Sequence, residues 1–385
     1  MHFETEIRTG RWLKAALLAS ALSLGLIACG EEQQSSKDET AAPDTVADTG
    51  STAPATPSGM EAMPGTDDMA GMEGMDHSEH AMTPAQFAEL RQKILLYRDM
   101  PDDQIAASMS RMPPDFHMVL SAEGAQGDIG LLALGHGYTL GGNEQFEKYV
   151  EPFAGVFPTA IAPGMAMMSS SHIQAALDEL TQKHGVKKIV VVPFEPGDES
   201  TLNHQWQYIF GLRDDAPYLS VPRVKTDAEI VMTKSPEKDP RMALIMMDYA
   251  LEISEHPAED LLIILSHGPE DPNENPAELA QLEAHAKIIK EESDFEDVKL
   301  MSIQDDAPRE VRAANLEEMR SWIKEANDKG QDVIIVPMLL TKGGFHARVA
   351  KELEPLKFKM AQHGLIEHPL FEEWLGETIR LAIQS

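Results

Sequence analysis

The sequence predicts an α/β fold with two similar halves, each a parallel sheet flanked by helices. Two observations support this prediction. From Asp128 onward, short apolar runs alternate with amphipathic stretches of helical spacing, and such alternation indicates βα units around a parallel sheet. The same order of motifs then occurs twice along the chain, which indicates a diverged internal repeat.

The repeat is visible in matching motifs. His136-Gly137 ends one apolar run, and His267-Gly268 ends its counterpart. A later run in each half ends in proline, and a further histidine follows it, His204 in the first half and His346 in the second. Because the whole order recurs, chance is a poor explanation for these histidines.

The spacing of apolar residues predicts the individual elements. In the first half, strands are expected at 129–135, 159–162, 187–194 and 218–222, and helices at about 143–155, 170–184, 199–211 and 240–255. In the second half, strands are expected at 261–266, 297–303 and 332–337, and helices at about 276–292, 309–328, 345–354 and 369–383. Ahead of both halves, residues 84–127 are expected to form a helical lead-in, capped at Thr83 and with a second short helix at 102–112.

Residues 1–29 have the character of an export signal. Basic residues precede an apolar stretch, 15–28, that is shorter than a membrane span of about 20 residues. The last four residues, LIAC, resemble a bacterial lipobox, in which the cysteine is lipidated; an ordinary signal peptide and an uncleaved anchor helix are the alternatives. We therefore expect an exported lipoprotein that faces the periplasm and touches the membrane only through the lipid on Cys29. The glycine at position 30 favours the outer membrane.

Residues 30–83 are expected to be a disordered tether, because they hold almost no large aliphatic side chains that could be buried. Part of this tether, 60–82, is dense in methionine and histidine. Thioethers are soft ligands that suit Cu(I), and imidazoles suit Cu(II), Ni or Zn. The segment is similar to the Met/His-rich tracts of periplasmic copper-handling proteins, although drift in a low-complexity linker is the alternative. The candidate metal-capturing residues are Met69, Met72, Met75, His77, His80 and Met82.

Composition limits the partners. The formal net charge of −32 argues against nucleic acid and anionic membrane surfaces, and it fits a soluble protein or one that collects cations. Cys29 is the only cysteine, so no disulfide within the chain can stabilise the fold. The sequence contains no phosphate loop or dinucleotide fingerprint, and we expect no organic cofactor.

The histidine motifs resemble those of the class II tetrapyrrole chelatases, the family of sirohydrochlorin cobaltochelatase and ferrochelatase. The first strand of that family leads into a motif like GHGS…GN, and residues 135–138 read GHGY here, with Asn143 after them. Its third strand resembles VVPLFL, followed by a glycine pair and a histidine, and residues 334–346 read IIVPMLLTKGGFH. The resemblance implies two chelatase-like halves, 128–257 and 258–385, that face each other across a cleft.

The histidines are expected where parallel sheets bind ligands, at the carboxyl ends of strands. A His–carboxylate–His set suits Co, Fe, Ni or Zn, and neutral imidazole can also accept protons from pyrrole nitrogens. The second half holds the fuller set, because its second strand ends at Asp305-Asp306 whereas the first half has no carboxylate there. The candidate metal ligands are His267, His346, Asp305, His136 and His204, of which His267, His346 and His136 are also the candidate catalytic residues.

For a single histidine, a capped turn or a hydrogen-bonded surface position is the commoner explanation, and the metal hypothesis rests on the set. The histidines on predicted helices, His172, His184 and His285, are expected at the surface. Lys342, Arg348 and Lys351 flank His346 and could meet substrate carboxylates, although solvation of a helix end explains them equally simply.

Two functions fit these features, and a haem or tetrapyrrole carrier is a third, weaker hypothesis. The first is an enzyme, a lyase that inserts a divalent metal into sirohydrochlorin or a related tetrapyrrole. The second is a non-enzymatic, lipid-anchored metal scavenger or metallochaperone for Cu, Co or Ni on the same scaffold. Tetrapyrrole biosynthesis is normally cytoplasmic, and an acidic protein repels a polycarboxylate substrate, so both points count against the enzyme. We favour the enzyme on the motifs; the sequence leaves the metal, the tetrapyrrole and the oligomeric state open.

Overall fold

The computed structural model describes residues 82–385, apart from 111, 138–139, 165 and 199. The predicted export signal with Cys29 and the tether up to residue 81 lie outside the described residues. All described residues belong to one unit, Ala62–Ser385. Within this part of the chain, no helix is both long and apolar enough to cross a membrane.

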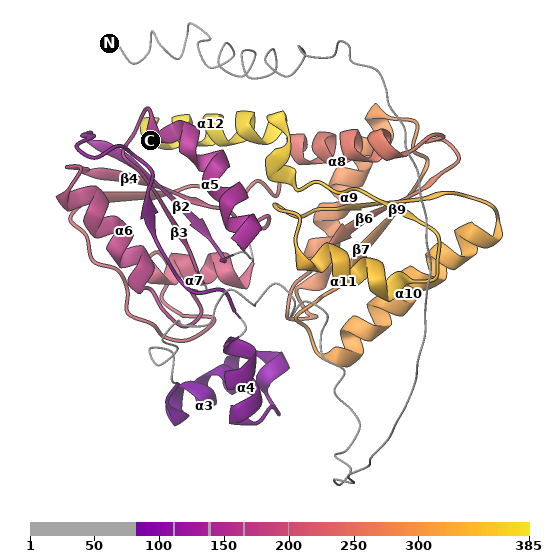
Figure 1. The fold of residues 1–385 in the computed structure, drawn as a ribbon. Helices are drawn as coiled ribbons and strands as arrows, with labels where there is room; N and C mark the ends of the chain where they lie inside the picture. The colour runs from indigo at the N-terminus through magenta and orange to yellow at the C-terminus, as the bar shows by residue number, and fades with distance from the viewer. Residues whose placement is uncertain (1–81, 111, 138–139, 165, 199) are drawn as a thin grey trace, which may run out of the picture. The chain divides into compact units, whose positions relative to one another are not determined.

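The first half is built on a five-stranded sheet with the order β1-β3-β2-β4-β5 (Figure 1). Its strands are β1 (Met118–Val119), β2 (Ile129–Gly135), β3 (Thr159–Pro163), β4 (Lys188–Pro193) and β5 (Glu229–Met232). Neighbouring strands are parallel except for β1 and β3. β2 is apolar along its length because helices bury both faces of the sheet.

The second half repeats this arrangement with a parallel sheet of order β7-β6-β8-β9. Its strands are β6 (Leu261–Ser266), β7 (Asp297–Ser302), β8 (Val333–Pro337) and β9 (Lys359–Met360). The order matches β3-β2-β4-β5, so the internal repeat predicted from the motifs is confirmed. In each half the first strand of the repeat, β2 or β6, lies between the second strand on one side and the third strand on the other, so the strand order reverses there. In α/β sheets, ligands bind at the carboxyl ends of the strands beside such a reversal.

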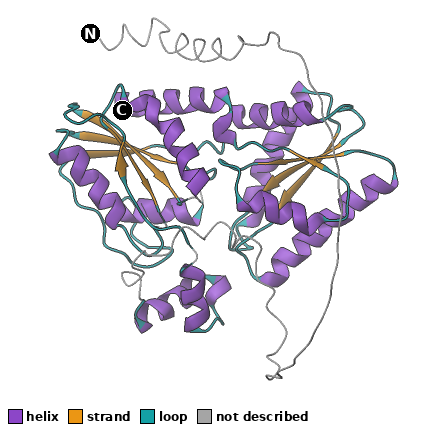
Figure 2. Ribbon diagram, in the orientation of Figure 1, coloured by secondary structure: helices purple, strands orange, loops and turns teal. Residues whose placement is uncertain are grey.

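Helices cover both faces of each sheet (Figure 2). The first half contains α5 (Leu140–Ala154), α6 (Ser171–Gln182), α7 (Thr201–Ile209) and α8 (Pro240–Ile253). The second half contains α9 (Asn275–Glu292), α10 (Arg309–Asp328), α11 (Gly344–Leu353), the short η4 (Leu365–Glu367) and α12 (Pro369–Gln384).

The last helix of each half crosses to the other half. α8 packs on β8, and α12 packs on β4 (Figure 1). As a result, one apolar core contains Val190 and Val192 of β4 together with Ile334 and Val336 of β8. This shared core fixes the two sheets in one unit, while separate cores fill the outer face of each sheet.

The lead-in consists of α3 (Pro84–Lys93), η3 (Leu95–Tyr97) and α4 (Asp102–Met109). The predicted cap is confirmed: the Thr83 hydroxyl accepts from the backbone N–H of Gln86, and the side-chain amide oxygen of Gln86 accepts from Thr83 N–H. The helical prediction is wrong beyond Met109, where α4 ends, and β1 then adds an antiparallel edge to the sheet.

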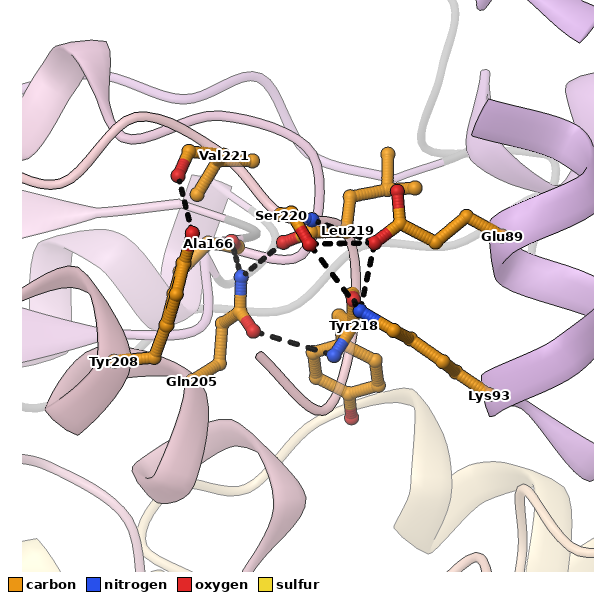
Figure 3. Close-up of polar contacts among 9 residues, drawn as sticks. All are labelled: Glu89, Lys93, Ala166, Gln205, Tyr208, Tyr218, Leu219, Ser220 and Val221. Carbon is orange, nitrogen blue, oxygen red and sulfur yellow. Dashed lines mark hydrogen bonds and ion pairs between the residues drawn. The ribbon is translucent and has the colours of Figure 1, made fainter. Parts of the chain in front are cut away.

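The predicted strand at 218–222 is wrong. This stretch is a loop between α7 and β5, and the fourth parallel strand lies at Glu229–Met232 instead. The backbone amides of this loop do not pair with a neighbouring strand: Tyr218 N–H donates to the Gln205 side chain and Ser220 N–H to the Glu89 side chain (Figure 3), while Val221 N–H donates to the Leu219 carbonyl within the loop. The alternating apolar residues of 218–222 resembled a strand, but Leu219 and Val221 belong to a loop that packs against the core.

The expectation that three helix-associated histidines lie at the surface is also wrong. His172, His184 and His285 are 4 %, 5 % and 2 % exposed. Each has a partner from a distant segment: His172 lies 3.4 Å from Asp115, and His184 and His285 bond to backbone carbonyls. Helical periodicity did not reveal these partners, because they come from other parts of the chain.

Candidate functional site

Two histidines occupy equivalent places at the carboxyl ends of the two central strands. His136 follows β2, and His267 follows β6. Each is followed by a glycine in the left-handed region, Gly137 with φ of 79° and Gly268 with φ of 78°. Glycine adopts this conformation without steric cost, so the chain can turn sharply just after each ring. The repeat thus presents one imidazole from each half.

The same turn determines which nitrogen of each imidazole ring carries the proton. Nδ1 of His136 lies 2.7 Å from the carbonyl oxygen of Gly137, and Nδ1 of His267 lies 3.2 Å from that of Gly268. A carbonyl oxygen only accepts hydrogen bonds, so Nδ1–H is the donor in both rings. In a neutral imidazole the lone pair is then on Nε2, the atom that would bind a metal.

The two rings come from different halves but influence each other. Burial lowers the pKa of His136, the charge of His267 lowers it further, and Asp306 acts in the opposite direction. Such effects require that the three groups lie near one another. Because its pKa is lowered, His136 is neutral at neutral pH, which is the form that a metal requires.

Asp305 and Asp306, which follow β7, form a close group with His267. Nε2 of His267 lies 3.6 Å from Oδ2 of Asp305 and 3.7 Å from Oδ2 of Asp306. One potential ligand atom from each residue lies within 4.8 Å of the others, a spacing that a metal ion could bridge. No other set of three such residues in the described chain comes this close. The second half therefore holds the more complete site.

Asp305 is also paired with two arginines. Nε of Arg312 donates to Oδ1 of Asp305 at 2.8 Å, and the guanidinium of Arg348 donates to Oδ2. The Asp305 side chain is only 5 % exposed, whereas that of Asp306 is 66 % exposed. The arginines hold Asp305 in place and balance its charge, so Asp306 is the carboxylate better placed to meet an arriving cation.

Three glutamates border the histidines. Burial raises the pKa of Glu195 to about 7 and that of Glu270 to about 8, and it also raises the pKa of Glu278. The charge of His267 acts on both Glu195 and Glu278, which places these carboxyls near the ring. Carboxyl groups with such pKa values can exchange protons near neutral pH.

Two aromatic residues complete the surroundings. The ring of Phe345 lies 5.5 Å from that of His267 between centroids, with 33° between their planes. Burial raises the pKa of Tyr218 well above its ordinary value, and the charges of Glu270, Asp306 and Glu195 raise it further. The loop between α7 and β5 therefore brings a phenol to the same carboxyls.

The structure places the other two predicted histidines apart from this close group. His346 lies in the first turn of α11 and is 3 % exposed. Its Nδ1 accepts from Gly343 N–H at 3.4 Å, and its buried Nε2 has no hydrogen-bond partner among the described residues. Burial lowers its pKa to about 4. His204 lies in α7. The hydrogen bond from Arg213 is the main cause of the lowered pKa of Asp215, and the charge of His204 lowers that pKa further.

The predicted metal-capturing residues of the tether lie outside the described residues, except Met82. Met82 is half-buried and packs against the outer core of the first half. Metal capture by the tether, like lipidation of Cys29, stays a prediction.

Sequence reasoning missed five of the residues around the histidines: Glu195, Tyr218, Glu270, Glu278 and Phe345. Only Glu195 carried a usable signal, because it is the first charged residue after the apolar run of β4. The others lie on loops and helices whose positions depend on tertiary packing.

Solved structures with a similar fold include SirB from Bacillus subtilis with Fe3+, which has a TM-score of 0.50 and 16% identity over 66% of this chain and 96% of that chain. DR2241 from Deinococcus radiodurans, described as a multi-domain protein with structural similarity to chelatases, has a TM-score of 0.41 and 20% identity over 66% of this chain and 55% of that one. CbiX, described as the terminal enzyme for siroheme biosynthesis in denitrifying bacteria, has a TM-score of 0.43 and 14% identity over 66% and 99%.

No family model and no curated protein matches the sequence. The likeness to SirB concerns the fold, since the identity is low. The chain has a chelatase-like α/β fold, in which parallel sheets are flanked by helices.

Proposed function

We propose that the protein binds a divalent metal ion between its two halves and inserts it into a tetrapyrrole. The observation that carries the proposal is the pair His136 and His267, one from each half, with both protons fixed on Nδ1 and with Asp306 close by. Two imidazoles, with an exposed carboxylate nearby that attracts cations, suit Co(II), Fe(II) or Ni(II). Such a site leaves coordination positions open, so the ion can be transferred.

Insertion requires that two pyrrole N–H groups lose their protons as the metal bonds to nitrogen. Glu195 and Glu278 are suitable acceptors, because they lie near His267 and their raised pKa values bring them toward neutrality. Each proton would pass from a pyrrole nitrogen to a carboxylate oxygen. Two acceptors beside one metal position match the two protons that must leave.

A tetrapyrrole assay tests the proposal. The protein is mixed anaerobically with sirohydrochlorin and Co(II) or Fe(II), and insertion is followed by absorbance. We expect insertion faster than the uncatalysed rate and loss of that acceleration in His267→Ala. His256→Ala is the matched control, because His256 is exposed and lies before β6, at the opposite end of the strand that leads to His267. Metal uptake without insertion in the wild-type protein would exclude the enzyme.

The acidic lining of the site favours a second function, a metal scavenger or metallochaperone. Asp306, Glu195, Glu270 and Glu278 all lie around the histidines. Carboxylates attract cations and repel a polycarboxylate macrocycle. Under this function, Co, Ni or Cu would bind stoichiometrically, and the methionine-rich tether would add affinity for Cu(I). Unchanged Cu(I) binding after deletion of 60–82 would contradict the role of the tether.

We also propose that the protein is exported and anchored through a lipid on Cys29, which rests on the lipobox-like sequence alone. Cys29→Ser should then release the protein from the membrane fraction and abolish incorporation of labelled palmitate. Membrane association that survives the substitution would contradict lipidation.

A further inference from the structure

The two repeated sheets differ in strand order at one edge. β3 and β7 are equivalent strands, because their last residues, Pro163 and Ser302, pair with the residues just before His136 and His267. On its outer side β3 carries β1, whereas no strand among the described residues pairs with the outer side of β7. The first sheet therefore continues where the second sheet ends.

The first half shows what this edge of the repeat accepts. The segment from Phe116 to Leu120 runs antiparallel to β3. Phe116 N–H donates to the carbonyl oxygen of Pro163 at 3.1 Å, and Leu120 N–H donates to that of Thr159 at 2.9 Å. An extended antiparallel segment thus satisfies the outward backbone groups, which an uncovered edge leaves open to another strand.

The corresponding backbone groups of β7 face outward. Ile303 N–H donates to the carbonyl oxygen of Ser266 at 3.2 Å, so it faces β6. Backbone direction alternates along a strand, so Lys299 also faces β6, while the N–H and C=O groups of Val298 and Leu300 point away from it. Within the part of the chain that the structure describes, these outward groups have no hydrogen-bond partner.

The side chains leave room along this edge. A groove of about 630 Å³ is lined by Lys299 and Leu300 of β7, by Leu279 and Glu283 of α9 and by Trp322 of α10. Lys299 and Leu300 point to opposite faces of the sheet, so a groove that touches both follows the edge itself. α9 and α10 border it from the two faces (Figure 1). A strand from outside can therefore reach β7 between the two helices.

The accessible part of β7 carries one acid and one base. Asp297 is exposed and Lys299 is half-buried, whereas Met301 and Ser302 at the end of the strand are each 3 % exposed. Asp297 and Lys299 lie two residues apart, so their side chains leave the same face of the sheet, where Lys299 lies over the ring of Trp322 at 4.7 Å. A strand that pairs here therefore meets both charges side by side.

Two copies of β7 complement each other when they pair antiparallel around Val298. Val298 faces outward in each copy, so the two residues exchange backbone hydrogen bonds, and Asp297 of each copy lies opposite Lys299 of the other. Residues opposed at such a position are only about 4.5 Å apart between Cα atoms, which brings the unlike charges together. A pair centred on Lys299 would instead oppose two lysines. Charge therefore selects a second copy in this register.

We propose that the outer edge of β7 binds the same edge of a second copy of this chain, in an antiparallel pair centred on Val298. The two second-half sheets then form one continuous sheet around a twofold axis, with α9 beside α9 and α10 beside α10. The pairing covers the groove at Leu279 and Trp322 as β1 covers β3 in the first half. This inference goes beyond the proposed function, because it names a partner and does not depend on the metal chemistry.

Charge reversal on β7 tests the pairing. Asp297→Lys gives a strand with two bases and Lys299→Asp a strand with two acids, so like charges meet in either homodimer. We expect each single variant to dimerise about tenfold or more weakly than wild type. An equimolar mixture of the two variants should regain the dimer, because the basic strand of one then faces the acidic strand of the other. The double variant Asp297→Lys/Lys299→Asp should dimerise as wild type does.

Sedimentation equilibrium measures these affinities on the whole chain, expressed without export so that no lipid is attached to Cys29. Both copies are acidic, with a formal net charge of −32. The measurements therefore use about 0.15 M salt, where the screening length of about 8 Å weakens distant repulsion more than adjacent charge pairs.

Asp128 and Lys187 supply matched controls. These residues lie just before β2 and β4, their side chains are 75 % and 78 % exposed, and they form an ion pair at 2.7 Å. Asp128→Lys and Lys187→Asp change the same residue types and the net charge by the same amounts as the β7 variants. Dimerisation should change by less than about twofold in either control.

Amide hydrogen exchange locates the contact. Val298 N–H faces the second copy, whereas Lys299 N–H faces β6. Exchange at Val298 should slow as the concentration of wild-type protein rises, and this slowing should disappear in Asp297→Lys. Exchange at Lys299 should be the same in both proteins.

Three results would overturn the inference: a wild-type chain that is monomeric at every concentration, a dimer that both charge reversals leave intact, or a mixture of the two variants that stays monomeric. If deletion of 30–81 turns a monomeric chain into a dimer, the tether covers this edge in the whole protein, which also overturns it. Dimers that follow the charge pattern support the inference whether or not the protein inserts a metal, so its outcome is separate from that of the proposed function.

Discussion

The two halves share one backbone plan but differ in the chemistry at their strand ends. Both present a histidine followed by a left-handed glycine after the first repeat strand. After the second strand, the second half carries Asp305-Asp306, whereas the first half carries Gly164. After the third strand, the first half carries Glu195, and the second half carries an apolar stretch that leads to α11. The repeat thus keeps the strand-end turns, while the side chains at the strand ends have diverged.

Packing explains why the residue directly after the second strand of the first half is a glycine. A Cβ at Gly164 would lie 2.4 Å from Oδ1 of Asp115 and 2.9 Å from Nε2 of His172. The buried His172 side chain and the partly buried Asp115 side chain occupy the space that a side chain at position 164 would need. Under the proposed function, the first half would supply one imidazole and a proton acceptor, and the second half would supply the metal-binding group.

The prediction with the largest expected effect concerns the two equivalent glycines, Gly137 and Gly268. A Cβ at Gly268 would lie 2.2 Å from Oγ of Ser302 and 2.8 Å from the backbone N of Gln304, whereas at Gly137 its nearest neighbour would be 3.4 Å away. We expect Gly268→Ala to lower the free energy of unfolding by about 4 kcal/mol and Gly137→Ala by about 1–2 kcal/mol. Denaturant unfolding measures both, and equal losses would show that the two turns are not packed differently.

The next test removes each strand-end imidazole. His267 lies near two aspartates, so it is central to the metal group, whereas His136 approaches from the other half. We expect His267→Ala to weaken Co(II) binding by about 100-fold or more and His136→Ala by about tenfold. Calorimetric titration measures both, with His256→Ala as the control. A larger loss in His136→Ala than in His267→Ala would mean that the first half, and not the second, contributes the more important metal ligand.

The sequence predicted three strands of each half, because a strand buried on both faces is an apolar run that ends at a polar residue, but it missed the short strands β1, β5 and β9. It also predicted His136 and His267 as strand-end residues, since position after such a run is a local property. It did not predict that α8 and α12 exchange halves, because an amphipathic helix shows which face is buried but not what covers that face. Long-range partners decided that part of the fold.

The loops were predicted less well than the strands, for the same reason. Tyr218 reaches the site because Glu89 and Gln205 hold its loop, and those residues lie far away in sequence. His346 follows a glycine pair that suggested an exposed ligand, but α11 begins at Gly344 and turns the ring inward. A motif therefore located the turn without fixing the direction of its side chain.

The burial of His346 predicts a pH dependence. Its folded pKa is about 4, whereas an unfolded histidine titrates near ~6.5. Between these values the unfolded chain binds more protons, so stability that is present above about pH 6.5 is lost as the pH falls toward 4. From pH 7 to pH 5 this residue should cost about 2 kcal/mol.

Replacing His346 by glutamine removes that contribution. Denaturant unfolding of wild type and His346→Gln across this pH range should give curves that converge as the pH falls. If the two curves stay parallel, His346 either keeps an ordinary pKa or is not buried in the folded protein, and the inward turn of α11 would be in doubt.

The smallest expected effect concerns Asp306, the carboxylate that distinguishes the second half at its exposed edge. Its side chain is 66 % exposed, so solvent screens its attraction for a cation, and Asp306→Asn should weaken Co(II) binding by only about threefold. The loss should shrink further at high salt. Asp305→Asn is no substitute for this test, because it would leave Arg312 and Arg348 without their shared partner. A loss above about 30-fold that persists at high salt would mean that Asp306 binds the ion directly. The second half would then form a metal site by itself, and His136 would be needed for transfer and not for capture.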